Sequence, residues 1–336
     1  MDMEDIAAAL VAPSKGILAA DESTGTIKKR LDSIKTASTK ESRRDYRELL
    51  FSAKDVGDYI SGVILYDETL RQAAKDGRQL TTLLEDQHII PGIKVDMGAK
   101  PLAFSDGELV TEGLDGLRER LAEYHDLGAR FAKWRAVISI GDGAPSQYCI
   151  DANAHALARY AALCQEANIV PIVEPEVLMD GDHSIDECYA ATETTLKAVF
   201  DELYKQRVVL EQMLLKPNMV VSGKDCPEQA GVDEVASKTL YCFSQTVPTA
   251  VPGIVFLSGG QPERQATEHL NAMNQLGRQP WEISYSFGRA LQASALAVWQ
   301  GKPANVEAAQ AAFLTRARLT SAARDGEYNA DMEANA

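Results

Sequence analysis

The sequence predicts a single parallel eight-stranded barrel of the (β/α)8, or TIM-barrel, type. Eight short apolar runs rich in β-favouring residues recur along the chain, and helical patterns lie between them. The 336 residues are 45% hydrophobic, which is enough for one large core. No segment rich in Pro, Gly or Ser divides the chain. We therefore expect one barrel domain over residues 1–324 and a flexible acidic tail over residues 325–336.

Each predicted strand is a continuous apolar run, which is typical of strands buried on both faces of a parallel sheet. Between the runs, apolar residues return at three- and four-residue steps, as from Leu114 to Tyr124, where Gly128 closes the segment. Eight strands match a closed barrel better than a doubly wound sheet, which typically has fewer. The runs are GILAAD (16–21), YISGVILY (59–66), IIPGIKV (89–95), ARFAKW (129–134), NIVPIVE (168–174), QMLLK (212–216), PGIVFLS (252–258) and WEISYSF (281–287).

Charge and composition exclude several classes of protein. The net charge of -15 argues against nucleic-acid binding, which needs a basic face. No apolar run is long enough to span a membrane, and the start MDMEDIAAAL carries acids where a signal peptide has basic residues. The five cysteines form no CxxC pair, so neither a disulfide framework nor a zinc clamp is indicated. We expect a cytoplasmic protein with no nucleic-acid or membrane partner, although a small phosphorylated ligand remains compatible with this charge.

Charged side chains stand where the apolar runs end. In a barrel of this kind the C-terminal ends of the strands form the active face. Residues two apart on a strand point the same way, so Lys133 with Arg135, and Glu174 with Glu176, are expected to project as pairs. A structural ion-pair network that only closes the barrel is the alternative, but burying several charges is costly, which favours a function. These strand-end residues are Asp21, Lys94, Asp96, Lys133, Arg135, Glu174, Glu176 and Lys216.

The residue types at the strand ends favour lysine chemistry. None of the five histidines ends an apolar run, which disfavours a metal-dependent lyase or hydrolase, and we expect neither a metal nor a cofactor. A lysine amine among other cations is expected to lose its proton more readily and to attack ketones, forming an iminium. Lys94, Lys133 and Lys216 all qualify by position. We favour Lys216, because apolar residues precede it and Pro217 stiffens the chain after it.

A phosphate site is predicted at the ends of the last two strands. Ser258, Gly259 and Gly260 follow the seventh run, and Gly288 and Arg289 follow the eighth, where a helical stretch begins. Loops after these two strands are the recurrent phosphate site of such barrels. Glycines expose backbone N–H groups, a helix N-terminus favours negative charge, and an arginine binds phosphate through two hydrogen bonds.

Seven motifs at the strand ends resemble those of class I fructose-bisphosphate aldolases. Together they cover nearly the whole chain in the order of that family. The resemblance implies a TIM-barrel lyase of glycolysis and gluconeogenesis that reversibly cleaves fructose 1,6-bisphosphate to dihydroxyacetone phosphate and glyceraldehyde 3-phosphate. The motifs are LAADEST (18–24), GIKVD (92–96), FAKWR (131–135), VEPE (173–176), LLKPNMV (214–220), LSGGQ (257–261) and FGRALQ (287–292).

The resemblance also implies a role for each matching residue. Lys216 would form the Schiff base, and Glu174 would move protons in carbinolamine dehydration and in carbon-carbon cleavage. Asp21 would orient the nucleophile and the substrate hydroxyls, Lys133 would hold a positive charge, and Glu176 would steady Lys216 and Lys133. The phosphate beside the ketone would be bound by Ser258, Gly259, Gly260, Gly288 and Arg289, and the other phosphate by Ser23, Thr26, Lys94 and Arg135.

The tail departs from the resemblance. Animal members of the family end in a tyrosine that assists proton exchange on the enamine, whereas Tyr328 is the only tyrosine in this tail and is not terminal. We do not expect Tyr328 to take that role. The resemblance suggests a homotetramer that acts on a sugar phosphate. Two alternatives are a transaldolase-like Schiff-base enzyme acting on a sugar monophosphate, and a scaffold that keeps the barrel and binds cytoskeletal filaments.

Overall fold

Eight parallel strands close into one barrel, as the sequence predicts. The computed structural model describes residues 1–334; Asn335 and Ala336, the end of the predicted tail, lie outside the described residues. Around the barrel the strand order is β1-β10-β9-β8-β7-β6-β3-β2. The strands are β1 (Gly16–Ala20), β2 (Ile60–Leu65), β3 (Ile90–Lys94), β6 (Phe131–Ile138), β7 (Val170–Val177), β8 (Leu214–Leu215), β9 (Gly253–Phe256) and β10 (Glu282–Phe287).

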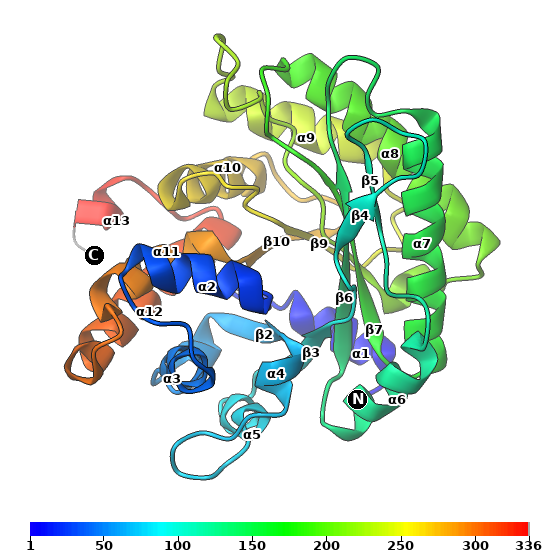
Figure 1. Cartoon of the computed structure of the whole chain (residues 1–336). Helices are drawn as coiled ribbons and strands as arrows, with labels where there is room; N and C mark the ends of the chain where they lie inside the picture. The colour runs from blue at the N-terminus through cyan, green and yellow to red at the C-terminus, as the bar shows by residue number, and fades with distance from the viewer. Residues whose placement is uncertain (335–336) are drawn as a thin grey trace.

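The helices surround the strands, with α1 lying close to the barrel (Figure 1). The pattern from Leu114 to Tyr124 is confirmed as a helix, α6, although it begins only at Leu117. No helix of residues 1–334 is long and apolar enough to cross a bilayer. The helices are α1 (Met3–Leu10), α2 (Thr24–Ser33), α3 (Lys40–Phe51), α4 (Asp67–Leu70), α5 (Leu80–Glu85), α6 (Leu117–Asp126), α7 (Gln147–Glu166), α8 (Ile185–Lys205), α9 (Val232–Thr246), α10 (Glu263–Gln275), α11 (Arg289–Trp299), α12 (Val306–Arg324) and α13 (Asp331–Ala334).

Side chains alternate between the inside of the barrel and the shell of helices. On β6, Phe131 belongs to the inner apolar cluster, whereas Ala132 and Trp134 belong to the outer cluster between strands and helices. This alternation is the two-residue period of a strand. Lys133 and Arg135 share the face of Phe131 and line a cavity. One strand therefore changes from an apolar inner face to a charged one along its length.

Strand glycines make room for the large residues that fill the barrel. A Cβ on Gly92 of β3 would lie 2.3 Å from the ring of Phe131, and one on Gly62 of β2 would lie 2.5 Å from Leu10 of α1. The inner cluster joins residues of α1 to residues of the strands. Helix α1 thus packs against the apolar half of the barrel interior, and the charged half is left open to solvent.

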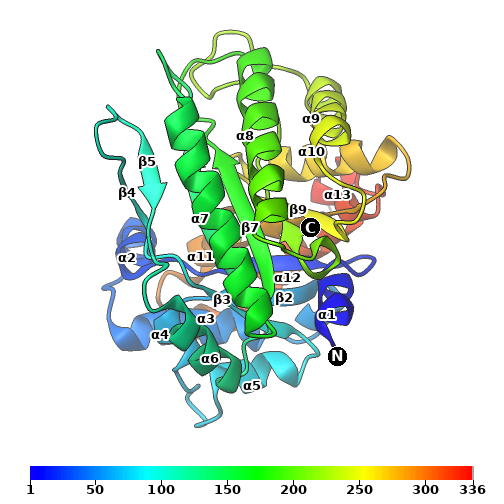
Figure 2. The same cartoon turned by 90° about the vertical axis from the view of Figure 1, so that its right-hand side faces the viewer.

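A β-hairpin outside the barrel is absent from the sequence prediction. Strands β4 (Ala99–Pro101) and β5 (Leu109–Thr111) form an antiparallel pair beside α7 (Figure 2). Glu108, which is buried, accepts hydrogen bonds from the backbone N–H and the hydroxyl of Ser146, each at 2.6 Å, and from the hydroxyl of Ser105. Ser146 is the N-cap of α7. One carboxylate therefore ties the hairpin to the start of a long helix.

Replacing Glu108 with alanine is expected to destabilise the fold by about 2 kcal/mol at neutral pH, because three hydrogen bonds to a buried carboxylate are lost. Burial alone would raise the pKa of Glu108, but hydrogen bonds from Ser105 and Ser146 hold the pKa below its usual value. For a group with a lowered pKa, the stabilisation is complete above the usual carboxyl pKa of 4.5 and disappears as the pH falls through the lowered pKa.

The measurement is the melting temperature of wild type and Glu108→Ala from pH 7 down to pH 3. We expect the difference in melting temperature between the two proteins to be constant near neutral pH and to become smaller in acid. A matched control is Glu112→Ala, which removes an exposed carboxylate just beyond the same hairpin. A gap that stays constant in acid, or an equal loss in the control, would contradict the assignment.

The C-terminal segment folds back over α10 and α12. The backbone N–H of Tyr328 donates to Asn271 on α10, and its hydroxyl donates to Glu333 at 2.9 Å. Glu333 also pairs with Arg316 of α12 at 2.8 Å. The side chain of Tyr328 is buried in these contacts and does not line the barrel cavity. The predicted division into a barrel and a flexible tail stays a prediction.

Candidate active site

The charged half of the barrel opens into a cavity of about 860 Å³, a size typical of small-molecule sites. Every residue that the sequence analysis singled out for catalysis or phosphate binding lines it. These are Asp21, Lys133, Glu174, Glu176, Lys216, Ser23, Thr26, Lys94, Arg135, Ser258, Gly259, Gly260, Gly288 and Arg289.

The strands bring the central residues together because each residue continues an inward-facing row. Ile172 of β7 and Leu214 of β8 lie in the inner apolar cluster, so Glu174 and Lys216, two residues further on, face the same interior. The backbone N–H of Lys216 donates to Val173 at 2.8 Å, which keeps the chain beside β7 beyond the end of β8. Lys216 therefore holds its place although the preceding strand is only two residues long.

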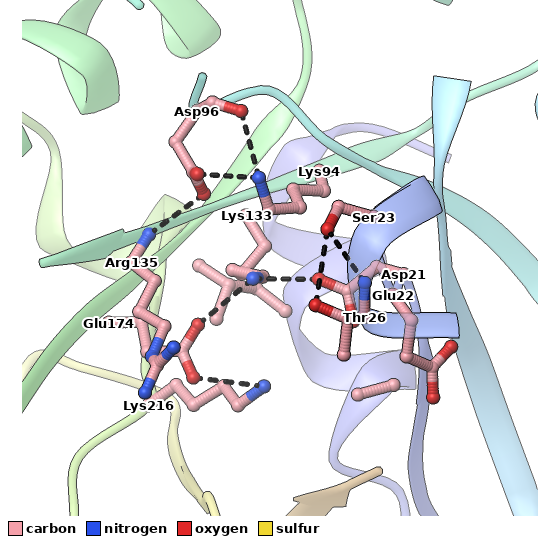
Figure 3. A network of polar contacts seen from close by, with 12 residues as sticks. Asp21, Glu22, Ser23, Thr26, Lys94, Asp96, Lys133, Arg135, Glu174 and Lys216 are labelled. Atoms are coloured by element: carbon pink, nitrogen blue, oxygen red, sulfur yellow. Dashed lines mark hydrogen bonds and ion pairs between the residues drawn. The ribbon is translucent and has the colours of Figure 1, made fainter. Parts of the chain in front are cut away.

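Two lysines share one carboxylate at the centre of the cavity (Figure 3). The Nζ atom of Lys216 lies 3.2 Å from Oε1 of Glu174, and that of Lys133 lies 3.3 Å from Oε2. Lys133 also pairs with Asp21 at 2.7 Å. The side chains of Lys133, Lys216 and Glu174 are each 4% exposed. The four groups form a continuous chain of charges shielded from bulk water.

The neighbours of Lys133 keep it and Asp21 in their charged forms. Burial alone would raise the pKa of Asp21, but the ammonium groups of Lys133 and Lys216 hold the pKa well below its usual value. Burial alone would lower the pKa of Lys133, but the carboxylates of Asp21 and Glu174 raise it well above its usual value. Lys133 is therefore a fixed positive charge and a hydrogen-bond donor.

One oxygen of Glu174 is left without a hydrogen bond. Its Oε2 is buried, and its 3.3 Å contact with Lys133 is an ion pair that does not reach hydrogen-bond geometry; no other residue of 1–334 bonds to it. Buried polar atoms are rarely left in this state, so an unpaired one requires an explanation. Glu174 lines the cavity, and its carboxylate lies between the amines of Lys133 and Lys216.

Two further ion pairs stand beside this chain of charges. Arg135 pairs with Glu176, and Lys94 pairs with Asp96 at 2.6 Å. Burial raises the pKa of Glu176 above its usual value, although Arg135 opposes the shift. The resemblance implied that Glu176 would steady Lys216 and Lys133, but the ion pair of its carboxylate is with Arg135.

The loops after β9 and β10 meet at one wall of the cavity. Gly259 and Gly260 have φ values of +61° and +95°, a region that favours glycine. A Cβ on Gly260 would lie 3.9 Å from Nη2 of Arg289, so the guanidinium lies against the glycine backbone. Gly288 precedes helix α11, which begins at Arg289. This wall combines exposed N–H groups, a helix N-terminus and an arginine, which are the features that bind phosphate.

A second group of cavity residues presents hydroxyls and cations. Ser23 is the N-cap of α2, and its hydroxyl lies 3.1 Å from that of Thr26 in the first turn. Lys94 and Arg135 line the same cavity from β3 and β6. The cavity therefore holds two groups of polar residues that suit anions, besides Lys133, Lys216 and Glu174.

Sequence reasoning missed several polar residues of the site. Ser286 of β10 is 1% exposed, lines the cavity, and its hydroxyl has no hydrogen-bond partner in residues 1–334. Its position two residues before Gly288, on the same face, is the signal that could have found it. Glu22, the residue after Asp21, forms ion pairs with Arg30 and with the buried Arg47. The sequence does not indicate which of these two adjacent acids pairs with Lys133 and which pairs with the arginines.

The carboxylates of the cavity do not form a metal site among residues 1–334. Within the described part of the chain, no group of three or more His, Cys, Asp or Glu side chains is arranged to hold an ion. His183 and His269 are buried but line no part of the cavity. The polar groups available for chemistry are amines, carboxylates and hydroxyls.

Comparison with known proteins gives a consistent result. The model of the family described as fructose-bisphosphate aldolase class-I matches residues 2–336. A protein of Xanthomonas campestris named a probable fructose-bisphosphate aldolase class 1 is 58% identical, over 97% of this chain and 98% of that protein. A fructose-bisphosphate aldolase of Dictyostelium discoideum is 52% identical, over 97% and 92%. The solved structure of Plasmodium falciparum fructose-bisphosphate aldolase, in complex with TRAP and a small-molecule inhibitor, is 50% identical with a TM-score of 0.96, over 97% and 95%.

Proposed function

Because this chain belongs to the class I fructose-bisphosphate aldolase family, we propose that it cleaves fructose 1,6-bisphosphate through a Schiff base on Lys216. The observation that carries the proposal is the carboxylate of Glu174, which is shared by the amines of Lys216 and Lys133 inside the barrel cavity. The family and its relatives favour an aldolase over the transaldolase-like and scaffold alternatives.

The reaction begins when Glu174 takes a proton from the ammonium group of Lys216, and the neutral amine then attacks the ketone carbon of the open-chain sugar. The carbinolamine loses water to give an iminium, and Glu174 supplies the proton that the departing hydroxyl needs. Glu174 then accepts the proton of the C4 hydroxyl while the C3–C4 bond breaks. The iminium takes up the electron pair as an enamine, and glyceraldehyde 3-phosphate leaves. Protonation of the enamine and hydrolysis release dihydroxyacetone phosphate.

The other charged groups hold the substrate between its two phosphates. The phosphate beside the ketone binds at Ser258, Gly259, Gly260, Gly288 and Arg289. Asp21 and Lys133 orient the substrate hydroxyls. Because Arg135 is the ion-pair partner of Glu176, we assign Glu176 to holding the guanidinium that receives the distal phosphate. Ser23, Thr26 and Lys94 complete that second site.

A bisphosphate substrate is expected to be preferred over a monophosphate, because Lys94 and Arg135, on β3 and β6, lie across the barrel from the phosphate loops after β9 and β10. Replacing Lys94 with methionine should lower kcat/KM for fructose 1,6-bisphosphate by roughly tenfold to a hundredfold, since a charge-assisted hydrogen bond is lost. The same variant should process fructose 1-phosphate almost as well as the wild type. Steady-state kinetics on both sugars measure the difference.

Lys28→Met is the matched control for this experiment. Lys28 is an exposed lysine on α2, the helix of Thr26, but it pairs with Asp32 and lies outside the cavity. It tests whether removal of any nearby positive charge weakens phosphate binding. Equal efficiency of the wild type on the two sugars, or equal losses in both variants, would count against the second phosphate site.

The setting of the enzyme is a further part of the proposal. We infer that it acts in the cytoplasm, which is supported by its five cysteines, all of them free thiols. The resemblance supports a homotetramer. Light scattering on the purified protein after size-exclusion chromatography measures the mass of the assembly.

A further inference from the structure

Gln261 directly follows the phosphate loop, the segment of residues 258–260, and forms a buried polar pair with His269 of α10. Gln261 is 4% exposed and His269 1% exposed. Nδ1 of His269 lies 2.6 Å from Oε1 of Gln261. The amide oxygen carries no proton, so Nδ1 donates to it. Burial lowers the pKa of His269 to about 4, so the imidazole is neutral at physiological pH and its tautomer is set by this hydrogen bond.

Gln261 joins the phosphate loop to two other parts of the site. Its backbone N–H donates to Ser258 at 3.0 Å, which closes the turn through the two glycines. Its side chain reaches His269 on α10 in one direction, and Nε2 faces the sulfur of Met219 at 3.6 Å in the other. Met219 belongs to the segment after Lys216. The N–H of Leu257 also donates to Pro217 at 3.2 Å.

These contacts matter because the phosphate loop contains two glycines, which do not hold a fixed backbone conformation by themselves. Two successive glycines lose more conformational entropy on ordering than other residues, so their N–H groups are not held toward a phosphate by local preference. Binding is tighter when that ordering is already complete in the free protein. Neither Gln261 nor His269 lines the cavity, so neither can touch the substrate.

We propose that Gln261 and His269 are positioning residues that hold the phosphate loop in its binding geometry and in register with Lys216. The inference deepens the proposed function and rests on it. The hydrogen bond between the two side chains fixes the loop against α10, and the contact with Met219 fixes it against the segment that carries the nucleophile.

The experiment compares His269→Leu with wild type in borohydride trapping by two ketones. Dihydroxyacetone phosphate uses the phosphate loop, whereas dihydroxyacetone has no phosphate. In His269→Leu we expect the half-saturating concentration of dihydroxyacetone phosphate to rise about tenfold, with the trapping rate at saturation and the rate with dihydroxyacetone unchanged. His269→Asn should restore the wild-type value, because its amide N–H can replace the Nδ1 donor.

Two controls separate positioning from general damage. Thr267→Val alters another fully buried polar residue of α10, which bonds Glu263 and Arg316 instead of the loop, and should leave the half-saturating concentration unchanged. The double variant Gln261→Leu/His269→Leu should bind dihydroxyacetone phosphate no more weakly than the weaker-binding of the two single variants. Each single variant already removes the hydrogen bond between the two side chains. The proposal would be overturned by an unchanged half-saturating concentration in His269→Leu, by failure of His269→Asn to restore the wild-type concentration, or by an equal rise in Thr267→Val.

Failure of the proposed function would look different. If the wild type traps neither ketone, the Schiff-base reaction is wrong, and calorimetry with inorganic phosphate then decides the loop proposal alone. We expect His269→Leu to bind phosphate about tenfold more weakly than wild type and His269→Asn to bind it equally well. Equal affinity of wild type and His269→Leu would reject the positioning role.

Discussion

Lys216→Met is expected to abolish both cleavage and covalent trapping. The proposed mechanism has one nucleophile, the Nζ atom of Lys216, which bonds to the ketone carbon of the substrate. Methionine fills a similar volume but has no amine. We expect kcat below about 10⁻⁴ of the wild-type value, since removal of a covalent nucleophile leaves only binding and electrostatic contributions. Borohydride reduction in the presence of fructose 1,6-bisphosphate should leave no adduct.

Peptide mapping makes this experiment specific among the three candidate lysines. In wild type the reduced adduct should lie on the peptide that contains Lys216. In Lys94→Met it should remain there, because Lys94 pairs with Asp96 at the edge of the site. An adduct on Lys133 or Lys94, or label retained in Lys216→Met, would show that another amine is the nucleophile. A folded wild type that forms no adduct would instead favour the scaffold.

The barrel was predictable because its signal is repeated. Each of the eight apolar runs overlaps one barrel strand, including the run at 212–216, where only Leu214 and Leu215 are paired as β8. The hairpin of β4 and β5 was not predictable in the same way. Each of its strands is only three residues long. The hairpin is held to α7 by Glu108, whose hydrogen-bond partner Ser146 is remote in sequence. Local sequence patterns cannot predict such a long-range contact.

The membership of the candidate site was also predictable, but its pairing was not. Position at a strand end, with a two-residue period, is enough to place Lys133 and Glu174 on the inner wall. It does not decide that Glu176 pairs with Arg135, or that Glu22 turns toward Arg47 while Asp21 turns toward Lys133. Those choices depend on contacts between residues that are far apart in the sequence. The expectation that neighbouring cations leave Lys216 unprotonated stays a prediction.

Glu174→Gln is expected to lower kcat by about 10²- to 10⁴-fold, the usual contribution of general acid-base catalysis. Glutamine keeps the shape of the side chain and can still accept a hydrogen bond from Lys216, but it cannot exchange a proton. Neither phosphate site includes Glu174, so KM should change little. The rate of borohydride trapping should also fall, because carbinolamine dehydration loses its proton donor, while the adduct still forms on Lys216.

The contrast with a second carboxylate of the cavity makes the result decisive. Glu123 lines the same cavity, but it is exposed and pairs with Arg71 at 2.5 Å. Glu123→Gln should therefore keep nearly the wild-type kcat. Thermal unfolding of both variants checks that each is folded. If Glu174→Gln kept more than about a tenth of wild-type kcat, below the usual acid-base contribution, another group would have to move the protons.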